Sequence, residues 1–209
     1  MTLVGDLGQA SGPWAPGSWD DVLAHLPIRR PPTRAALSVN YRTPSEVMNL
    51  AARVLVAATP GPAPPSSVRR AGVEPMVTEA RTGRLAETVA RTAARELEAL
   101  AEGKVAVICP ASLVEELRKA LPEVPDGAGV LDAPVALLTV GQAKGLEFDS
   151  VVVVEPAGIV AEGTGATGRR ALYVAMTRTT RRLHLVHVDP LPPELGPQAG
   201  ERAGARMAG

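Results

Sequence analysis

Two runs of aliphatic residues most constrain what this chain can fold into: residues 134–140 (PVALLTV) and residues 150–156 (SVVVVEP). Both have the length of a strand, and neither alternates between apolar and polar side chains. Strands of this kind are buried on both faces, which happens when helices cover both sides of a parallel sheet. The two runs therefore predict a parallel sheet with helices between its strands.

The rest of the chain supplies such an alternation. Further strand-like segments are residues 2–6, 35–40, 74–80, 104–110 and 181–188. Helical patterns occupy residues 18–26, 43–58, 84–102 and 111–121, and another helix opens at about residue 171. Strands that alternate with helices predict an α/β fold, a doubly wound parallel sheet in three layers.

The helix predicted over residues 43–58 has clear start signals. Thr43 suits the N-cap, Pro44 the first helical position, and Glu46 the third position, where an acid favours the helix dipole. At the other end of the chain, His184 and His187 lie three residues apart in a predicted strand. They therefore point to opposite faces and cannot share a metal ion.

Composition excludes several classes of protein. Hydrophobic residues make up 45% of the chain, which is enough for a packed core, and the formal net charge is zero. Because the net charge is zero, no long-range electrostatic attraction draws the whole chain to nucleic acid, and any contact with a polyanion depends on local arginines. A single cysteine, no charged leader and no membrane-length apolar run predict a soluble, cytoplasmic protein.

Polar and cationic residues follow several of the predicted strands. Residues 5–9 (GDLGQ) follow the first, residues 40–42 (NYR) the second, and residues 141–148 (GQAKGLEF) the run at 134–140. In open α/β sheets, ligands bind at the carboxyl ends of the strands. We therefore expect these groups to converge on that edge and to bind a phosphate-bearing ligand.

Four segments resemble the ordered motifs of superfamily 1 helicases of the UvrD/Rep type. Residues 2–9 (TLVGDLGQ) are similar to motif III, 40–51 (NYRTPSEVMNLA) to motif IV, 137–155 (LLTVGQAKGLEFDSVVVVE) to motif V, and 171–185 (ALYVAMTRTTRRLHL) to motif VI. They occur in the family's order. The resemblance implies a RecA-like domain of the P-loop NTPase type, with ATP and Mg²⁺ as cofactors and DNA as a partner.

The resemblance also implies roles for individual residues. Arg42 and Arg178 match arginines that reach the γ-phosphate, where a planar cation stabilises developing charge. Gln9 matches a glutamine that senses the terminal phosphate, Tyr41 an aromatic residue that stacks on adenine, and Glu147 an acid at the ribose.

Other matches are structural or partial. Thr139 and Gly145 would shape the turn that lets the backbone approach the nucleotide. Trp14 lies where the family often has a base-stacking aromatic residue, and Gly141 replaces the usual histidine of motif V. Arg181 and Arg182 are interpreted as ordinary charges beside a strand.

No G-x-x-x-x-G-K-[ST] segment occurs in the sequence, so the chain does not itself cradle a β-phosphate and Mg²⁺. We expect residues 1–30 to be a remnant of a first RecA-like domain, residues 31–189 the second, and residues 190–209 a flexible tail. An N-terminal P-loop domain is then the expected partner, and the chain alone should not hydrolyse ATP. The strand at residues 2–6 would lack its native neighbours.

The spacing of the motifs bears on the branch of the superfamily. Arg42 and Thr139 are only about a hundred residues apart, which leaves no room for the helical insertion of the processive enzymes. The chain is thus most similar to the HelD-type branch, whose members remodel RNA polymerase. The alternatives are a stand-alone RecA-like module that docks on a protein without using ATP, and an unrelated α/β enzyme with Glu147 as a base.

Overall fold

A five-stranded parallel sheet forms the centre of the structure, a computed structural model that describes residues 2–10, 12, 15–28, 30–59, 64–125, 129–130 and 132–196. In spatial order its strands are β3 (Met76–Glu79), β7 (Thr179–His187), β6 (Phe148–Val154), β4 (Val105–Cys109) and β5 (Val135–Thr139). All four pairings between neighbours are parallel. The sheet confirms the parallel arrangement that the two aliphatic runs predict.

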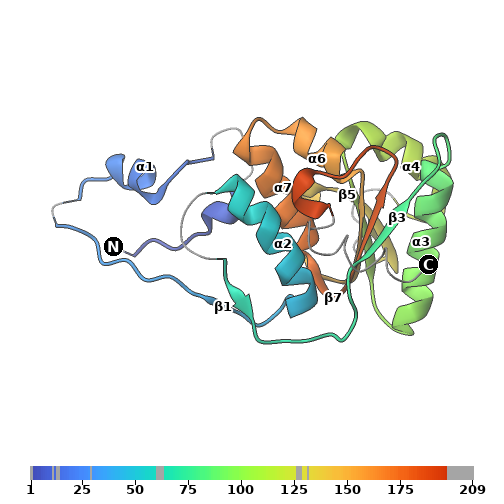
Figure 1. The fold of residues 1–209 in the computed structure, drawn as a ribbon, viewed down its shortest axis with the longest axis horizontal. Coiled ribbons are helices and arrows are strands. Elements are labelled where there is room, and N and C mark those ends of the chain that lie inside the picture. The colour runs from blue at the N-terminus through green and yellow to red at the C-terminus, as the bar shows by residue number, and fades with distance from the viewer. Residues whose placement is uncertain are drawn as a thin grey trace, which may run out of the picture.

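Helices cover both faces of this sheet, as Figure 1 shows. On one face lie α2 (Ser45–Ala58), α5 (Val140–Ala143), α6 (Pro156–Glu162) and α7 (Ala166–Met176). The other face is covered by α3 (Leu85–Leu100) and α4 (Val114–Ala120). The predicted three-layer α/β architecture is confirmed.

The side chains of β6 explain why its sequence does not alternate. Val151 and Val153 pack into the core beneath α2 and α7, whereas Val152 and Val154 pack beneath α3 and α4. All four are fully buried. A strand with helices on both sides has no solvent face, so every position favours an aliphatic residue.

The smaller elements lie beside this body. They are the short helices η1 (Leu7–Gln9), η2 (Ala111–Leu113) and η4 (Pro193–Leu195), helix α1 (Trp19–Ala24), and the strands β1 (Val39–Asn40) and β2 (Ser66–Ser67). Strands β1 and β2 form a separate two-stranded parallel sheet. In Figure 1, α1 lies well away from the sheet. None of the helices described is long and apolar enough to cross a membrane.

Residues 2–6, which the sequence analysis expects to lack their native strand neighbours, form no strand, and Leu3 and Val4 are exposed. The following η1 nevertheless packs on α7, where Gly8 is buried against Leu55 and Tyr173. Arg170 of α7 donates hydrogen bonds to the carbonyl oxygens of Ala10 and Pro16 at 3.4 and 3.2 Å. The N-terminal segment is therefore attached to the domain through α7.

The C-terminal segment packs against α2. Leu195 of η4 belongs to the core, Arg53 donates to the carbonyl oxygen of Gly196 at 2.5 Å, and Arg169 forms an ion pair with Glu194 at 2.6 Å. Residues 190–196 of the expected tail are thus packed. Residues 197–209 lie outside the described part of the chain.

Helix α2 begins at Ser45 with Pro44 as its N-cap, so the predicted N-cap at Thr43 is wrong by one residue. No side chain caps the helix. Proline fits here because its fixed φ is compatible with the extended conformation of an N-cap, and because it has no N–H that needs a partner. Glu46 is consequently the second helical residue rather than the third.

A buried ionic cluster lies between α3 and the sheet. Glu96 is 2% exposed, and its carboxylate accepts hydrogen bonds from Ser150 at 2.8 Å, from Arg182 at 2.7 Å and from His184 at 3.3 Å. Arg182 is therefore not an ordinary flanking charge, and its earlier interpretation is wrong. Sequence alone gave no sign of this pair because its members are 86 residues apart.

Glu96 generates a prediction about pH. Burial acts to raise the pKa of Glu96, but the hydrogen bonds from His184, Arg182 and Ser150 outweigh it and lower the pKa to about 2. A lowered carboxylate pKa stabilises the fold above the unfolded value near 4.5, and this stabilisation is lost as the pH falls towards 2. We expect a loss of on the order of 3 kcal/mol in unfolding free energy across that window.

Urea unfolding measured between pH 2 and pH 7 checks this expectation. Glu96→Gln should remove that part of the pH dependence, whereas Glu98→Gln, an exposed acid of the same helix, should leave it unchanged. Equal pH profiles for the Glu96→Gln chain and the original chain would contradict the assignment.

Gly168 generates a prediction about packing. A Cβ at this position of α7 would lie 2.0 Å from the carbonyl oxygen of Val160 in α6, so the two helices approach through the glycine. We expect Gly168→Ala to lower the unfolding free energy by about 2–4 kcal/mol, despite the better helix propensity of alanine. Gly141→Ala in α5, where a Cβ meets only an atom at 3.9 Å, is the control and should not lower stability in the same denaturation assay.

Candidate functional site

A cleft of about 400 Å³ gathers most of the residues that the sequence analysis selected. Five of them line it: Gln9, Tyr41, Arg42, Glu147 and Arg178. They come from η1, from the loop after β1, and from the residues just before β6 and β7. Segments that are up to 169 residues apart in sequence therefore meet at one place.

The cleft lies at the amino ends of β6 and β7, and the expectation of a site at the carboxyl edge of the sheet is wrong. Glu147 immediately precedes β6, and Arg178 immediately precedes β7. Phe148 and Thr179, the first residues of these strands, are paired. The error has a simple cause: α5 and its loop return the chain from the carboxyl end of β5 to the amino end of β6, so the residues after β5 do not stay at its end.

Arg178 is the most enclosed of the cleft residues, with 9% exposure. Its Nε donates to the carbonyl oxygen of Val174 at 3.1 Å, and one terminal nitrogen donates to that of Leu146 at 3.4 Å. The other terminal nitrogen lies 3.5 Å from Oε1 of Gln9. Among the described residues no carboxylate forms an ion pair with Arg178, so its direct partners are all neutral.

Burial lowers the pKa of Arg178 from its ordinary value, and nearby Arg42 acts in the same direction while Glu147 opposes it. The guanidinium stays protonated at neutral pH because its ordinary pKa is far above 7. The cleft therefore contains a fixed, partly desolvated positive charge. Such a charge attracts an anion more strongly than a solvated one does.

Arg42 differs from Arg178 in its surroundings. Its side chain is 76% exposed, and it forms an ion pair with Glu147 across the cleft. Its backbone is held by Asn40, because Oδ1 of Asn40 accepts hydrogen bonds from the N–H groups of Arg42 at 2.8 Å and Thr43 at 3.2 Å. A local turn thus presents Arg42, while its guanidinium is free to change partner.

The two tyrosines of the cleft have contrasting environments. The ring of Tyr41 is 72% exposed, so its faces are accessible to a planar ligand. Tyr173 of α7 is buried, and burial together with the nearby Asp6 raises the pKa of its hydroxyl to about 12. Tyr173 belongs to the floor of the cleft and was not predicted as a site residue.

Gln9 is oriented by Asp6, a second residue that the sequence analysis missed. One carboxylate oxygen of Asp6 accepts from the side-chain amide of Gln9 at 2.8 Å, and the other accepts from the N–H of Gly8 at 2.8 Å. The amide oxygen of Gln9 then faces Arg178. The short spacing between Asp6 and Gln9 within GDLGQ could have predicted the hydrogen bond between their side chains.

Thr139 and Gly145 do not line the cleft. Thr139 caps α5 through a reciprocal pair of hydrogen bonds with Gln142, at 2.9 and 3.4 Å. Gly145 has a φ of +85°, which favours glycine, in the turn that leads to Glu147. Trp14, the remaining predicted site residue, lies outside the described residues.

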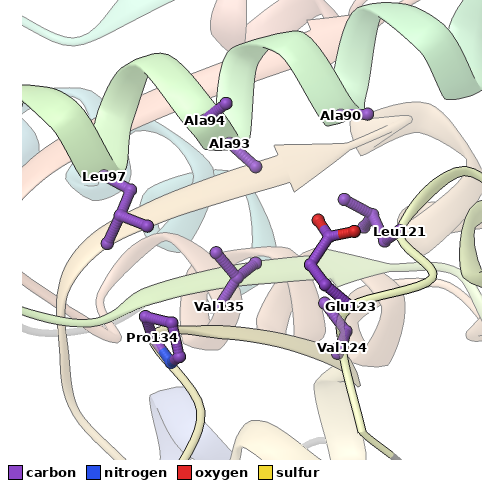
Figure 2. A pocket seen from close by; sticks show the side chains of 9 residues that line it. All are labelled: Ala90, Ala93, Ala94, Leu97, Leu121, Glu123, Val124, Pro134 and Val135. Carbon is purple, nitrogen blue, oxygen red and sulfur yellow. The ribbon is translucent and has the colours of Figure 1, made fainter.

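A second hollow, of about 130 Å³, lies on the other face of the sheet. Figure 2 shows Ala90, Ala93 and Ala94 of α3 above it and Val135 of β5 below it. Glu123 is its one titratable side chain, and no cation lines it. Nor do the described residues contain a group of three or more His, Cys, Asp or Glu placed to hold a metal ion. The cleft is therefore the better candidate site.

The donor set of the cleft suits a particular kind of ligand. Two guanidinium groups provide N–H donors and positive charge, which match the oxygen atoms of a phosphate. Tyr41 provides an exposed ring, and Glu147 an acceptor for hydroxyl groups. Such groups suit a ligand that carries phosphate, hydroxyl and aromatic groups.

Part of the chain matches a known family. Residues 134–186 match the sequence model of the UvrD-like helicase C-terminal domain. This segment includes β5, β6, α7 and most of β7, and hence Glu147 and Arg178. None of the curated proteins compared with the chain matches it.

The fold also matches a solved structure. A crystal structure from Lactobacillus plantarum WCFS1, described as the C-terminal domain of a "possible DNA helicase", aligns with a TM-score of 0.52 and 25% sequence identity. The alignment covers 75% of this chain and 92% of that one. The sheet and its helices are thus consistent with the RecA-like fold of a helicase C-terminal domain.

Proposed function

We propose that this chain is the second RecA-like domain of a superfamily 1 motor ATPase. It would close over ATP and Mg²⁺ held by a P-loop domain and supply two arginines to the nucleotide. The observation that carries the proposal is the buried guanidinium of Arg178, which has only neutral partners among the described residues and faces a cleft with Arg42 and Tyr41. The match of residues 134–186 to a UvrD-like helicase C-terminal domain supports it.

Arg178 and Arg42 would bind the terminal phosphate. In ATP hydrolysis the γ-phosphoryl group would pass from ADP, the leaving group, to a water molecule, through a transition state with negative charge spread over its oxygens. A buried, preoriented guanidinium such as that of Arg178 stabilises this charge without needing to rearrange. Arg42 would leave Glu147 and add a second donor, because its exposed side chain can turn towards an incoming anion.

The other cleft residues would orient the nucleotide. Tyr41 would stack on the base, and Glu147, once released from Arg42, would accept a hydrogen bond from the ribose. Gln9 lies next to Arg178 and would report on the terminal phosphate. Gly145 and Thr139 would act indirectly, since they shape the connection that leads to Glu147.

The catalytic site would be complete only with a partner domain. The 209 residues contain no phosphate-binding G-x-x-x-x-G-K-[ST] loop, so the β-phosphate and Mg²⁺ need groups from elsewhere. The N-terminal P-loop domain of the motor is the proposed source. Hydrolysis would then change the angle between the two domains.

RNA polymerase is the proposed target of the motor, with translocation on DNA as the other output. Between β1 and β5 the described residues form α2, β2, β3, α3, β4, η2 and α4, with no inserted helical domain. This short connection favours the HelD-type branch over the processive helicases. Gly141, in place of the usual histidine of motif V, also favours a target other than DNA.

Replacing Arg178 tests the proposal. We expect the chain mixed with the P-loop domain of the motor to hydrolyse ATP, and Arg178→Ala to lower kcat by roughly 10³-fold, because a catalytic arginine contributes this much or more in related reactions. Phosphate release measured under saturating ATP gives the rate. Arg178→Lys should not restore it, since lysine lacks the planar fork.

Arg181→Ala is the matched control. Arg181 lies in the same arginine cluster but is half-exposed and has a long ion pair with Asp149, at 3.9 Å. Its substitution should leave kcat unchanged. Full activity with alanine at position 178 would refute the role of the arginine, and a mixture without any ATPase activity would favour a docking module that uses no ATP.

A further inference from the structure

We propose that Glu46 is a positioning residue that holds residues 66–72, here named the brace, against residues 40–43, here named the cleft loop. The brace would thereby fix where Tyr41 and Arg42 enter the cleft. The functional part of this inference rests on the proposed nucleotide-binding role of the cleft. Glu46 is 26 residues away from the end of the brace, and no feature of the sequence links the two.

The brace contacts the backbone of the cleft loop directly. The hydroxyl of Ser67 donates to the carbonyl oxygen of Thr43 at 2.6 Å, and Arg69 donates to the carbonyl oxygen of Arg42 at 3.2 Å. The pairing of β1 with β2 aligns the two segments, since Asn40 lies opposite Ser67. The peptide groups on the C-terminal side of Arg42 are therefore held from outside the loop.

Glu46 holds the far end of the brace. Its carboxylate accepts hydrogen bonds from the N–H groups of Ala71 at 3.3 Å and Gly72 at 2.9 Å. Gly72 has a φ of +71°, a conformation that favours glycine. In return, the N–H of Ser45 donates to the carbonyl oxygen of Arg69 at 2.8 Å. The start of α2 and the brace are thus joined in both directions.

The charge of Glu46 is well suited to this role. Its own backbone N–H and that of Gly72 lower the pKa of Glu46 from its ordinary value, so it is ionised at neutral pH. An ionised carboxylate makes stronger hydrogen bonds to backbone N–H groups than a neutral acceptor does. Of these N–H groups, only that of Glu46 itself belongs to the first turn of α2, which has no side-chain cap.

The cleft loop needs this support because its functional side chains have little packing of their own. Tyr41 is 72% exposed, and the side chain of Arg42 is 76% exposed. Neither residue belongs to the hydrophobic core, and nor does Glu46. The positions of the two side chains therefore depend on the backbone of the loop, and loss of Glu46 should leave the fold intact.

Glu46→Ala in the full chain tests the inference, with Glu116→Ala as the matched control. Glu116 is an exposed acid in the first turn of α4, so its loss reproduces the change in helix charge without touching the cleft. We expect backbone ¹⁵N order parameters at Tyr41 and Arg42 to fall from near 0.85 to below about 0.6 in the Glu46→Ala chain. The control chain should keep the higher values.

ATP binding provides a readout that a purely stabilising role would not change. Titration of the chain and the P-loop domain of the motor together with ATP, followed by the NMR signals of Tyr41 and Arg42, should give a dissociation constant weaker by on the order of tenfold for Glu46→Ala, and unchanged for Glu116→Ala. Unchanged order parameters would overturn the inference, as would lower order parameters with unchanged ATP affinity. If the original chain mixed with the P-loop domain shows no ATP response, the proposed function of the cleft fails, and the order parameters alone decide on the brace.

Discussion

The parallel register of β6 and β7 sets the geometry of the cleft. Phe148 pairs with Thr179, and the N–H of Phe148 donates to the carbonyl oxygen of Arg178 at 2.9 Å. The residues just before the two strands, Glu147 and Arg178, are thus brought to the same end of neighbouring strands. This pairing in turn depends on helices over both faces of the sheet, because β6 is buried on each side.

The two arginines of the cleft differ in how firmly their guanidinium groups are held. Arg178 is held by the last turn of α7 and by the loop before β6, so it is in place before any ligand arrives. Arg42 has its backbone fixed by Asn40 and the brace, but its guanidinium is exposed and paired with Glu147. A ligand anion would have to compete with Glu147 for Arg42 but not for Arg178.

The sequence predicted the parts of the fold that depend on local pattern. Both-face aliphatic runs identified β5 and β6, and helical periodicity identified α2 and α3. It also selected five residues that the structure brings into one cleft. What it missed depends on contacts distant in sequence: the pairing of Arg182 with Glu96, and the turn of the chain that moves the site to the amino ends of β6 and β7. Neither leaves a periodic signal.

A buried arginine without an ion pair indicates an anion-binding site only when it also lines an open cleft. Arg170 and Arg178 are both buried, and both have only neutral hydrogen-bond partners among the described residues. The guanidinium of Arg170 donates hydrogen bonds to Thr59 and to carbonyl oxygens of the N-terminal segment, and so it holds that segment on α7. Arg178 instead lines an open cleft beside a second arginine and an exposed aromatic ring. Leaving a buried charge without a counter-ion is unfavourable, and of these two arginines only Arg178 lines the cleft, where an incoming anion could relieve it.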